Sequence, residues 1–483
     1  MSTTGAVPES DVVTRQAWLA LAVATLVSFL VVIDISVVNV AFPTIQADFG
    51  SSETALSWIV SGYNIGVAAF LLLGGRLADS VGRKKVFLPG VALFMAGSLL
   101  CGLAPNTGFL IAARLIQAVG GAVLMPASLA LVLPEFPLSR RSMAVGFWGA
   151  TGSLGAAFGP AMGSVLILLG SWRWVFLINV PICLLVLVLG KRVFRESRNP
   201  DANGRIDLLG VPIGTAGVAL VMLAIVQSEI WGILSPRVLG LAAVGLALLG
   251  LLIARSRRHP EPLIELSLFR YRSFASCNLA VAFYAMAFPS AVLLNSLMLQ
   301  SLWGCSILAT GAALTPSPLL ATITSIIGGR FADRYGHRWL IGIGSLLLAV
   351  TPVLYLLLLG ETPHVWDRFV PISLLAGLGT GMSIASWFSA SVSDVGPARF
   401  GVANATLRTV MQVFYGIGVS VVITLLAGHA GLAGFRLGWV WVAAMMLLSA
   451  VMVVATFPAG SSAGRVVVSG PVGGTARNSL ATR

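Results

Sequence analysis

The stretch GGRLADSVGRKK, residues 74–85, recurs as GGRFADRYGHR, residues 328–338. Each copy directly follows a long apolar run. A second pair of segments, PEFPLSRRSMAVG at 134–146 and SDVGPARFGVANA at 393–405, aligns at nearly the same separation. Two pairs of matching segments at nearly the same separation indicate that the chain consists of two related halves.

The composition places these halves in a lipid bilayer. The 483 residues are 57% hydrophobic and only 10% charged, whereas a soluble chain has about 25% charged residues. A single soluble core does not grow to this size. The composition therefore predicts an all-α polytopic membrane protein.

Apolar runs of about 20 residues mark the expected membrane spans. We expect fourteen, with the first too long, and too closely followed by the next, for a cleavable signal peptide. Their approximate positions are 16–41, 54–75, 86–104, 108–133, 142–168, 173–194, 206–227, 237–254, 273–301, 309–331, 339–359, 368–392, 401–427 and 437–457.

The basic residues lie in alternate loops. The net charge is +13, but nucleic-acid binding would need a basic face on a soluble domain. With both termini in the cytoplasm, most lysines and arginines fall on the cytoplasmic side, as the positive-inside rule requires. Only four are expected on the other side: Arg173, Arg237, Arg368 and Arg436.

The repeat divides the chain into bundles and linkers. We expect a cytoplasmic tail over 1–15, six-helix bundles over 16–194 and 272–457, two additional helices within 195–271, and a disordered tail over 458–483. Repeated halves around a midplane site describe a secondary transporter. The four cysteines are isolated, and His259, His337, His364 and His429 all fall in expected loops. We therefore expect no metal or other cofactor.

Three charged residues fall well inside expected spans, away from their ends, where each is costly and commonly functional. Asp34 is the only acidic residue clearly within a span, and burial there favours its protonated form. Arg114 is expected to face the central cavity and to act with Gln117 on protons or substrate. For Arg408, a salt bridge or backbone partner is as consistent with the sequence as a substrate contact.

Asp34 is the candidate for proton coupling. One pH unit supplies about 1.4 kcal/mol per proton, and 100 mV supplies about 2.3 kcal/mol. The sequence contains no G-x-x-x-x-G-K-[ST] motif that would indicate nucleotide hydrolysis. Two alternatives remain for Asp34: a structural hydrogen bond to a neighbouring helix, and attraction of a cationic substrate.

Four segments resemble the motifs of the major facilitator superfamily, within it the fourteen-helix drug:proton antiporters of the EmrB/QacA type. The resemblance covers nearly the whole chain. Ser80, Ala118 and Ser164 depart from the residues usual in three of the motifs. The matching segments are LADSVGRKK (77–85), RLIQAVGGA (114–122), GAAFGPAMGS (155–164) and IDISVVNVAFP (33–43).

Two of these motifs predict gating elements. In the first, Asp79 can accept hydrogen bonds from helix amides or from Arg83 and so latch the halves together in one state; a plain basic loop is the alternative. In the motif at 155–164, closely spaced glycines allow a hinge or seal, or merely tight packing. The gating candidates are Gly75, Asp79, Gly82, Arg83, Asp333, Gly155, Gly159, Pro160 and Gly163.

A few polar or aromatic groups in apolar helices suit an amphipathic or hydrophobic substrate. The cavity candidates are Trp58, Tyr63, Asn64, Gln117, Asn295, Trp387, Arg408 and Gln412. We thus expect a monomeric inner-membrane antiporter that exports drug-like compounds in exchange for protons. The alternatives are a nutrient symporter, a siderophore or metabolite exporter, a membrane enzyme, for which no catalytic cluster exists in the spans, and a non-transporting sensor or scaffold.

Overall fold

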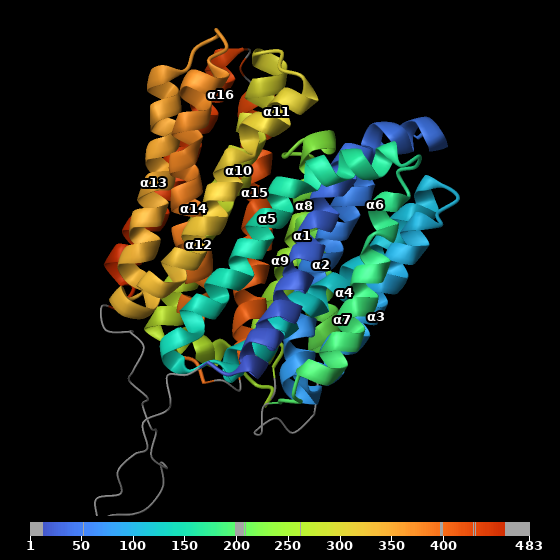
Figure 1. Cartoon of the computed structure of the whole chain (residues 1–483), viewed down its shortest axis with the longest axis vertical. Coiled ribbons are helices and arrows are strands. Elements are labelled where there is room, and N and C mark those ends of the chain that lie inside the picture. Colours follow the sequence, from blue (N-terminus) through green and yellow to red (C-terminus); the bar gives the residue numbers. More distant parts are fainter. Residues whose placement is uncertain are drawn as a thin grey trace, which may run out of the picture.

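The structure, a computed structural model, describes residues 13–458 except 52, 199–206, 208, 261, 397–398, 428 and 430. Some helical residues, including Pro160 and Asp333, are described by their backbone alone. The expected tails lie largely outside the described part. Over that part the chain forms helices and no strands (Figure 1), which confirms the predicted all-α class.

The N-terminal bundle and the two additional helices occupy the first part of the chain. α6 is a four-residue turn that leads into α7. The helices are α1 (Arg15–Phe49), α2 (Glu53–Val81), α3 (Arg83–Gly102), α4 (Thr107–Val132), α5 (Arg141–Leu168), α6 (Trp174–Leu177), α7 (Asn179–Val193), α8 (Gly210–Trp231) and α9 (Pro236–Ser256).

The C-terminal bundle follows, and its second span is broken into two helices, with Pro316 at the start of the second. Proline is well tolerated at that first helical position. The helices are α10 (Arg272–Leu297), α11 (Ile307–Leu314), α12 (Pro316–Tyr335), α13 (His337–Leu358), α14 (Val370–Ser391), α15 (Phe400–Ala427) and α16 (Leu432–Thr456).

Thirteen helical segments of the described chain are long and apolar enough to cross a membrane. They match thirteen of the fourteen expected spans, and α5, 28 residues long, occupies the place of the remaining one. We call the end of the molecule where α1 begins and α16 ends the proximal end, and the opposite one the distal end.

α1 is longer than the expected span 16–41. Its 35 residues extend about 52 Å, more than the roughly 30 Å hydrocarbon core. Its distal end carries Asp48, which accepts hydrogen bonds from Trp172 Nε1 and Arg173 Nη1, both at 2.9 Å. The bonds from Trp172 and Arg173 hold the pKa of Asp48 below its usual range. We call these contacts of Asp48 with Trp172 and Arg173 the distal strap. The distal strap is therefore intact at neutral pH and is lost only as acid protonates Asp48.

The repeated motif lies at helix ends and not in a loop as expected. α2 continues through Val81, and only Gly82 separates it from α3. Gly82 has φ +130° and Gly336, at the same place in the second copy, has φ +84°, a region that residues with a Cβ rarely adopt. His337, expected in a loop, instead begins α13 and is buried.

The two additional helices bridge the bundles. α8 packs on α2 and α15, one helix from each bundle. Ala68 of α2 and Met222 of α8 share an apolar cluster against which Val413 of α15 packs. Asp207 joins the helices to each other, since its carboxylate accepts from the Gly210 amide and from Arg255 of α9.

The bundles meet at the proximal end and draw apart toward the distal end (Figure 1). Ser142 and Ser389 hydrogen bond at 2.7 Å, Ser325 Oγ donates to the Gly146 carbonyl at 3.0 Å, and Thr322 Oγ1 donates to the Ala150 carbonyl at 3.4 Å. The first contact joins the proximal ends of α5 and α14, and the other two join α5 to the middle of the broken span formed by α11 and α12. The structure is therefore a state closed at its proximal end.

Candidate functional site

A buried polar cluster surrounds Asp34 inside the N-terminal bundle. Arg114 Nη1 donates to Asp34 Oδ2 at 2.6 Å. Gln117 Nε2 and Asn179 Nδ2 donate to Asp34 Oδ1 at 2.9 and 2.7 Å. Asp34 is 1% exposed and Arg114 is 0% exposed. Three donors thus converge on one buried carboxylate.

The remaining contacts fix the orientation of Arg114 and Gln117. Arg114 Nη1 also donates to Gln117 Oε1 at 2.6 Å, and the guanidinium lies 4.0 Å from the ring centre of Tyr63. Gln117 Nε2 and Asn179 Nδ2 both reach Ser98 Oγ. The cluster therefore joins α1, α2, α3, α4 and α7 through side chains that depend on the charge of Asp34.

Two polar atoms of this cluster, Arg114 Nη2 and Asn179 Oδ1, are buried without a hydrogen-bond partner in the described structure. A fully satisfied structural network would leave few such atoms. Removing one partner of a buried ion pair is strongly destabilising. Asp34 is therefore the acceptor that holds Arg114, Gln117 and Asn179 together.

The structure brings together Asp34, Arg114 and Gln117, which the sequence singled out as candidates, and shows the pairing of Asp34 with Arg114 that the sequence did not. It also missed Ser98 and Asn179. A single serine or asparagine in an apolar helix carries no distinctive pattern. Tyr63 and Gln117, expected in the substrate cavity, belong to this cluster.

The glycines of α5 lie against α1 on either side of Asp34 in the chain. A Cβ at Gly155 would lie 3.1 Å from the Phe29 carbonyl oxygen, and one at Gly159 would lie 2.3 Å from Ser36 Cβ. Gly163 is also buried, and α5 continues as a helix through Pro160. Close packing of α1 on α5 thus accounts for the first two glycines, and a hinge role stays a prediction.

The latch contacts expected for Asp79 are confirmed. Asp79 Oδ2 accepts from the backbone amide of Val402 at 2.8 Å, and Oδ1 accepts from Arg83 Nη2 at 3.0 Å. Arg83 Nη1 also reaches the Ala130 carbonyl. Val402 lies in the first turn of α15, where free amides and the helix dipole attract an anion. Asp79 therefore ties the N-terminal bundle to the C-terminal one at the proximal end.

Backbones of the two bundles come very close beside this latch. A Cβ added at Gly75 would lie 2.4 Å from Ala405 Cβ and 2.7 Å from the Gly401 carbonyl oxygen. Only a residue without a side chain permits this approach. Asp333, the counterpart of Asp79, lies in the last turn of α12, but its side chain is outside the described part.

Arg408 lies between the bundles without an acidic partner among the described residues. Its guanidinium is 4.7 Å from the ring centre of Trp148 in α5 and 4.5 Å from that of Phe388 in α14. Its Nε is buried and has no hydrogen-bond partner. The structure thus provides aromatic neighbours in place of the salt bridge or backbone partner that the sequence left open.

The other cavity candidates do not converge on one pocket. Trp58 and Asn64 are partly buried in α2, and Gln412 is partly buried in α15. Asn295 in α10 has a buried Oδ1 without a hydrogen-bond partner among the described residues. Trp387 is 0% exposed and packs near Tyr284, with ring centres 5.9 Å apart, inside the C-terminal bundle. Their role in substrate binding stays a prediction.

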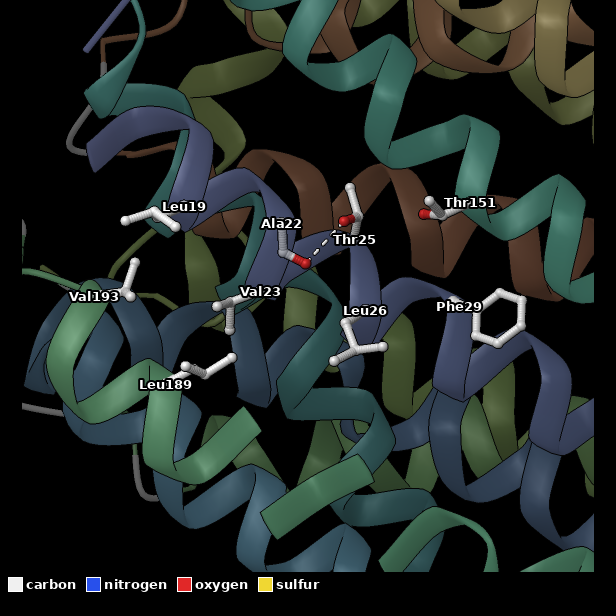
Figure 2. A pocket seen from close by; sticks show the side chains of 9 residues that line it. All are labelled: Leu19, Ala22, Val23, Thr25, Leu26, Phe29, Thr151, Leu189 and Val193. Carbon is white, nitrogen blue, oxygen red and sulfur yellow. Dashed lines mark hydrogen bonds between the residues drawn. The ribbon is translucent and has the colours of Figure 1, made fainter. Parts of the chain in front are cut away.

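A separate groove of about 370 Å³ lies between α1 and α7, with Thr151 of α5 at its rim (Figure 2). Thr25 Oγ1 donates to the Ala22 carbonyl within α1, so the threonine is already satisfied. None of the candidate residues lines this groove. Apart from Thr25 and Thr151, its lining is apolar: Leu19, Ala22, Val23, Leu26, Phe29, Leu189 and Val193.

Known proteins are similar to this sequence over most of its length. The family model described as Major Facilitator Superfamily matches residues 24–254. Puromycin resistance protein pur8 of Streptomyces alboniger is 34% identical over 416 residues, which cover 85% of this chain and 82% of the relative. The chain belongs to the major facilitator superfamily.

Other similarities to this major facilitator protein agree. Methylenomycin A resistance protein of Bacillus subtilis is 29% identical over 90% of this chain and 93% of its own length. The crystal structure of the human organic anion transporter MFSD10 (TETRAN) superposes with a TM-score of 0.69 over 90% of this chain and 99% of that chain. At 16% sequence identity, this last match supports the fold alone. The resemblance stated from the sequence motifs is thereby confirmed.

Proposed function

We propose that this major facilitator protein exports drug-like amphipathic or hydrophobic compounds across the cytoplasmic membrane in exchange for protons. The names of its relatives support export, because two of them are antibiotic resistance proteins. The observation that carries the proposal is the buried ion pair of Asp34 and Arg114. A titratable group inside the membrane can bind a proton from one side and release it to the other.

The positive-inside rule supports placing the proximal end in the cytoplasm. Arg83, Lys84 and Lys85 begin α3 there, and Lys191 and Arg192 end α7 at the same end. We accordingly place both termini in the cytoplasm and the chain in the inner membrane as a monomer. The described structure then represents an outward-facing state, since its proximal, cytoplasmic end is closed.

Proton binding and the latch act together in this proposal. A proton that enters from outside neutralises Asp34 and releases Arg114, Gln117 and Asn179 from their shared acceptor. α1 then repacks on α5, whose glycines Gly155 and Gly159 lie against it. The bundles rock, the Asp79 latch opens, and substrate binds from the cytoplasm. Proton release to the cytoplasm restores the ion pair and the closed proximal end.

Transport in inverted vesicles tests this function. A fluorescent amphiphile should accumulate inside inverted vesicles when their interior is made acidic, because protons leaving the vesicle drive the compound inward. Collapse of the gradient by a protonophore should stop the accumulation. Accumulation that follows the opposite gradient would indicate a symporter, and gradient-independent transport would refute proton coupling.

The topology gives a separate prediction. Reporter fusions at Ser197 and Ser267 should both read cytoplasmic, and a fusion at Ser235, just before α9, should read external. This pattern follows from two additional spans between the bundles. Three cytoplasmic readings would contradict it, since they would describe a twelve-span protein with a long internal loop.

Gly75→Ala should reduce export at least tenfold without loss of the folded protein. The new Cβ would collide with Ala405 and with the backbone of Gly401, so the proximal end could not close. Gly240→Ala is the matched control, because a Cβ there has no neighbour within 4 Å. Spin labels at the proximal ends of α2 and α15 should lie farther apart in Gly75→Ala. Unchanged distances and unchanged export would contradict the role of this contact in closure.

A further inference from the structure

The seam between the bundles contains a cluster of one cation and two aromatic rings. Arg408 of α15 lies over both Trp148 of α5 and Phe388 of α14, and these two rings meet edge to face at 5.4 Å. Trp148 and Phe388 are 2% and 4% exposed. The N-terminal bundle thus supplies one ring, and the C-terminal bundle supplies the other ring and the cation.

Two hydrogen-bond donors in this cluster lack an acceptor. Arg408 Nε and Trp148 Nε1 are both buried and have no partner in the described structure. Buried donors are almost always paired in native proteins, because desolvation without a compensating bond is costly. An indole has no acceptor and a guanidinium has none, so these two groups cannot satisfy each other.

The positive charge of Arg408 also requires a partner that the seam between the bundles does not provide among the described residues. No described carboxylate lies within salt-bridge distance of Arg408, whereas the other intramembrane cation, Arg114, is paired with Asp34. Aromatic faces compensate a cation only in part. A cation in the membrane interior normally pairs with an anion or with backbone carbonyls. A carboxylate, phenolate or sulfonate of a ligand would supply that charge and accept from both free N–H groups.

We infer that Arg408 and Trp148 form the subsite that binds the anionic group of an acidic substrate. This inference rests on the proposed export function and names a substrate class for it. In the closed seam the guanidinium carbon lies 4.7 Å from the ring centre of Trp148 and 4.5 Å from that of Phe388. Opening of the seam toward the cytoplasm separates Trp148 from Arg408 and lets an anion bind between them. Closure then brings the rings back, which weakens anion binding and favours release on the outside.

Binding of two dyes of opposite charge to purified protein tests the inference. The probes are fluorescein, an anion, and rhodamine 123, a cation with a similar ring system, each followed by fluorescence polarisation. Arg408→Gln should raise the Kd for fluorescein at least tenfold and leave that for rhodamine 123 unchanged or lower. Arg408→Lys, which keeps the charge, should stay within about threefold of wild type. Trp148→Phe keeps an aromatic ring, although a smaller one, and removes the N–H, so it should raise the Kd for fluorescein a few fold.

Several results would overturn the subsite. One is an equal loss of binding of both dyes in Arg408→Gln. Another is unchanged fluorescein binding in both Arg408→Gln and Trp148→Phe. The third is the absence of saturable fluorescein binding to the wild-type protein. Trp148→Phe decides the question if Arg408→Gln does not fold. The measurement needs no proton gradient. Rhodamine binding without fluorescein binding would therefore refute this subsite alone, whereas failure of gradient-driven transport in vesicles would refute the proposed function.

Discussion

Asp34→Asn should abolish export driven by a pH gradient. The substitution keeps the shape of the side chain but removes the group that carries the proton. It also replaces one carboxylate oxygen by an NH₂ donor, which then faces either Arg114 or the pair Gln117 and Asn179. Exchange of labelled for unlabelled substrate without a gradient should survive, because exchange needs no net proton movement. Asp34→Glu should keep partial activity with a displaced pH optimum.

Two variants separate the role of Asp34 in proton coupling from its role in stabilising the fold. Asp48→Asn is the control for the loss of a carboxylate paired with an arginine, since it makes the same change in the exposed distal strap. Leaving Arg114 buried without its partner should cost about 3–5 kcal/mol of stability. The double variant Asp34→Asn/Arg114→Gln removes both charges and should recover much of that stability without recovering coupling. If substrate addition still releases protons from the purified Asp34→Asn protein, proton coupling resides at another residue.

Asp79→Asn should lower export at least tenfold while the protein remains inserted and binds substrate within about threefold of wild type. An amide at this position is a weaker acceptor for the Val402 amide and no longer attracts Arg83 as a charge. The outward-facing state is thus destabilised relative to the inward-facing one. Distances between the proximal ends of α2 and α15, measured with spin labels, should show a larger open population.

Asp207→Asn is the matched control for this latch. Asp207 also accepts from a helix amide and an arginine, but within the two additional helices and away from the seam. Asp207→Asn should lower the free energy of unfolding more than it lowers the rate of export. Asp333→Asn should do less than Asp79→Asn, because only the first copy carries the longer basic run Arg83-Lys84-Lys85. Equal effects of Asp79→Asn and Asp333→Asn would contradict an asymmetric latch.

The fold could be predicted from the sequence because few backbone structures can span a lipid bilayer. Apolar runs must be helices where no water can hydrogen bond to their backbone. The repeat of the GGRLADSVGRKK segment indicated that the two halves of the chain have related folds. The ends of helices were less predictable. α1 continues past the hydrocarbon region to Phe49, where contacts with Trp172 and Arg173 at its last turns hold it. Those contacts join residues far apart in the chain, and no local pattern reports them.

The site was predictable where a charge stood out against an apolar background. Asp34, Arg114 and Arg408 were visible for that reason, and Asp79 because it is repeated. Asn179 and Ser98 were not, since their importance depends on which helix faces Asp34. The pairing of a residue in α1 with residues in α4 and α7 is a property of packing, and one sequence alone does not contain it.

The latch has a consequence for the synthesis of the protein. Asp79 and the amide that it accepts from are 323 residues apart. At about 5–20 residues per second, translation leaves this carboxylate without that amide for roughly 15 to 65 seconds. Arg83, four residues away, is made at once and can pair with Asp79 during this interval. The same arginine that completes the latch in the finished transporter thus keeps a nascent helix end from presenting a bare charge to the membrane while the second half is still on the ribosome.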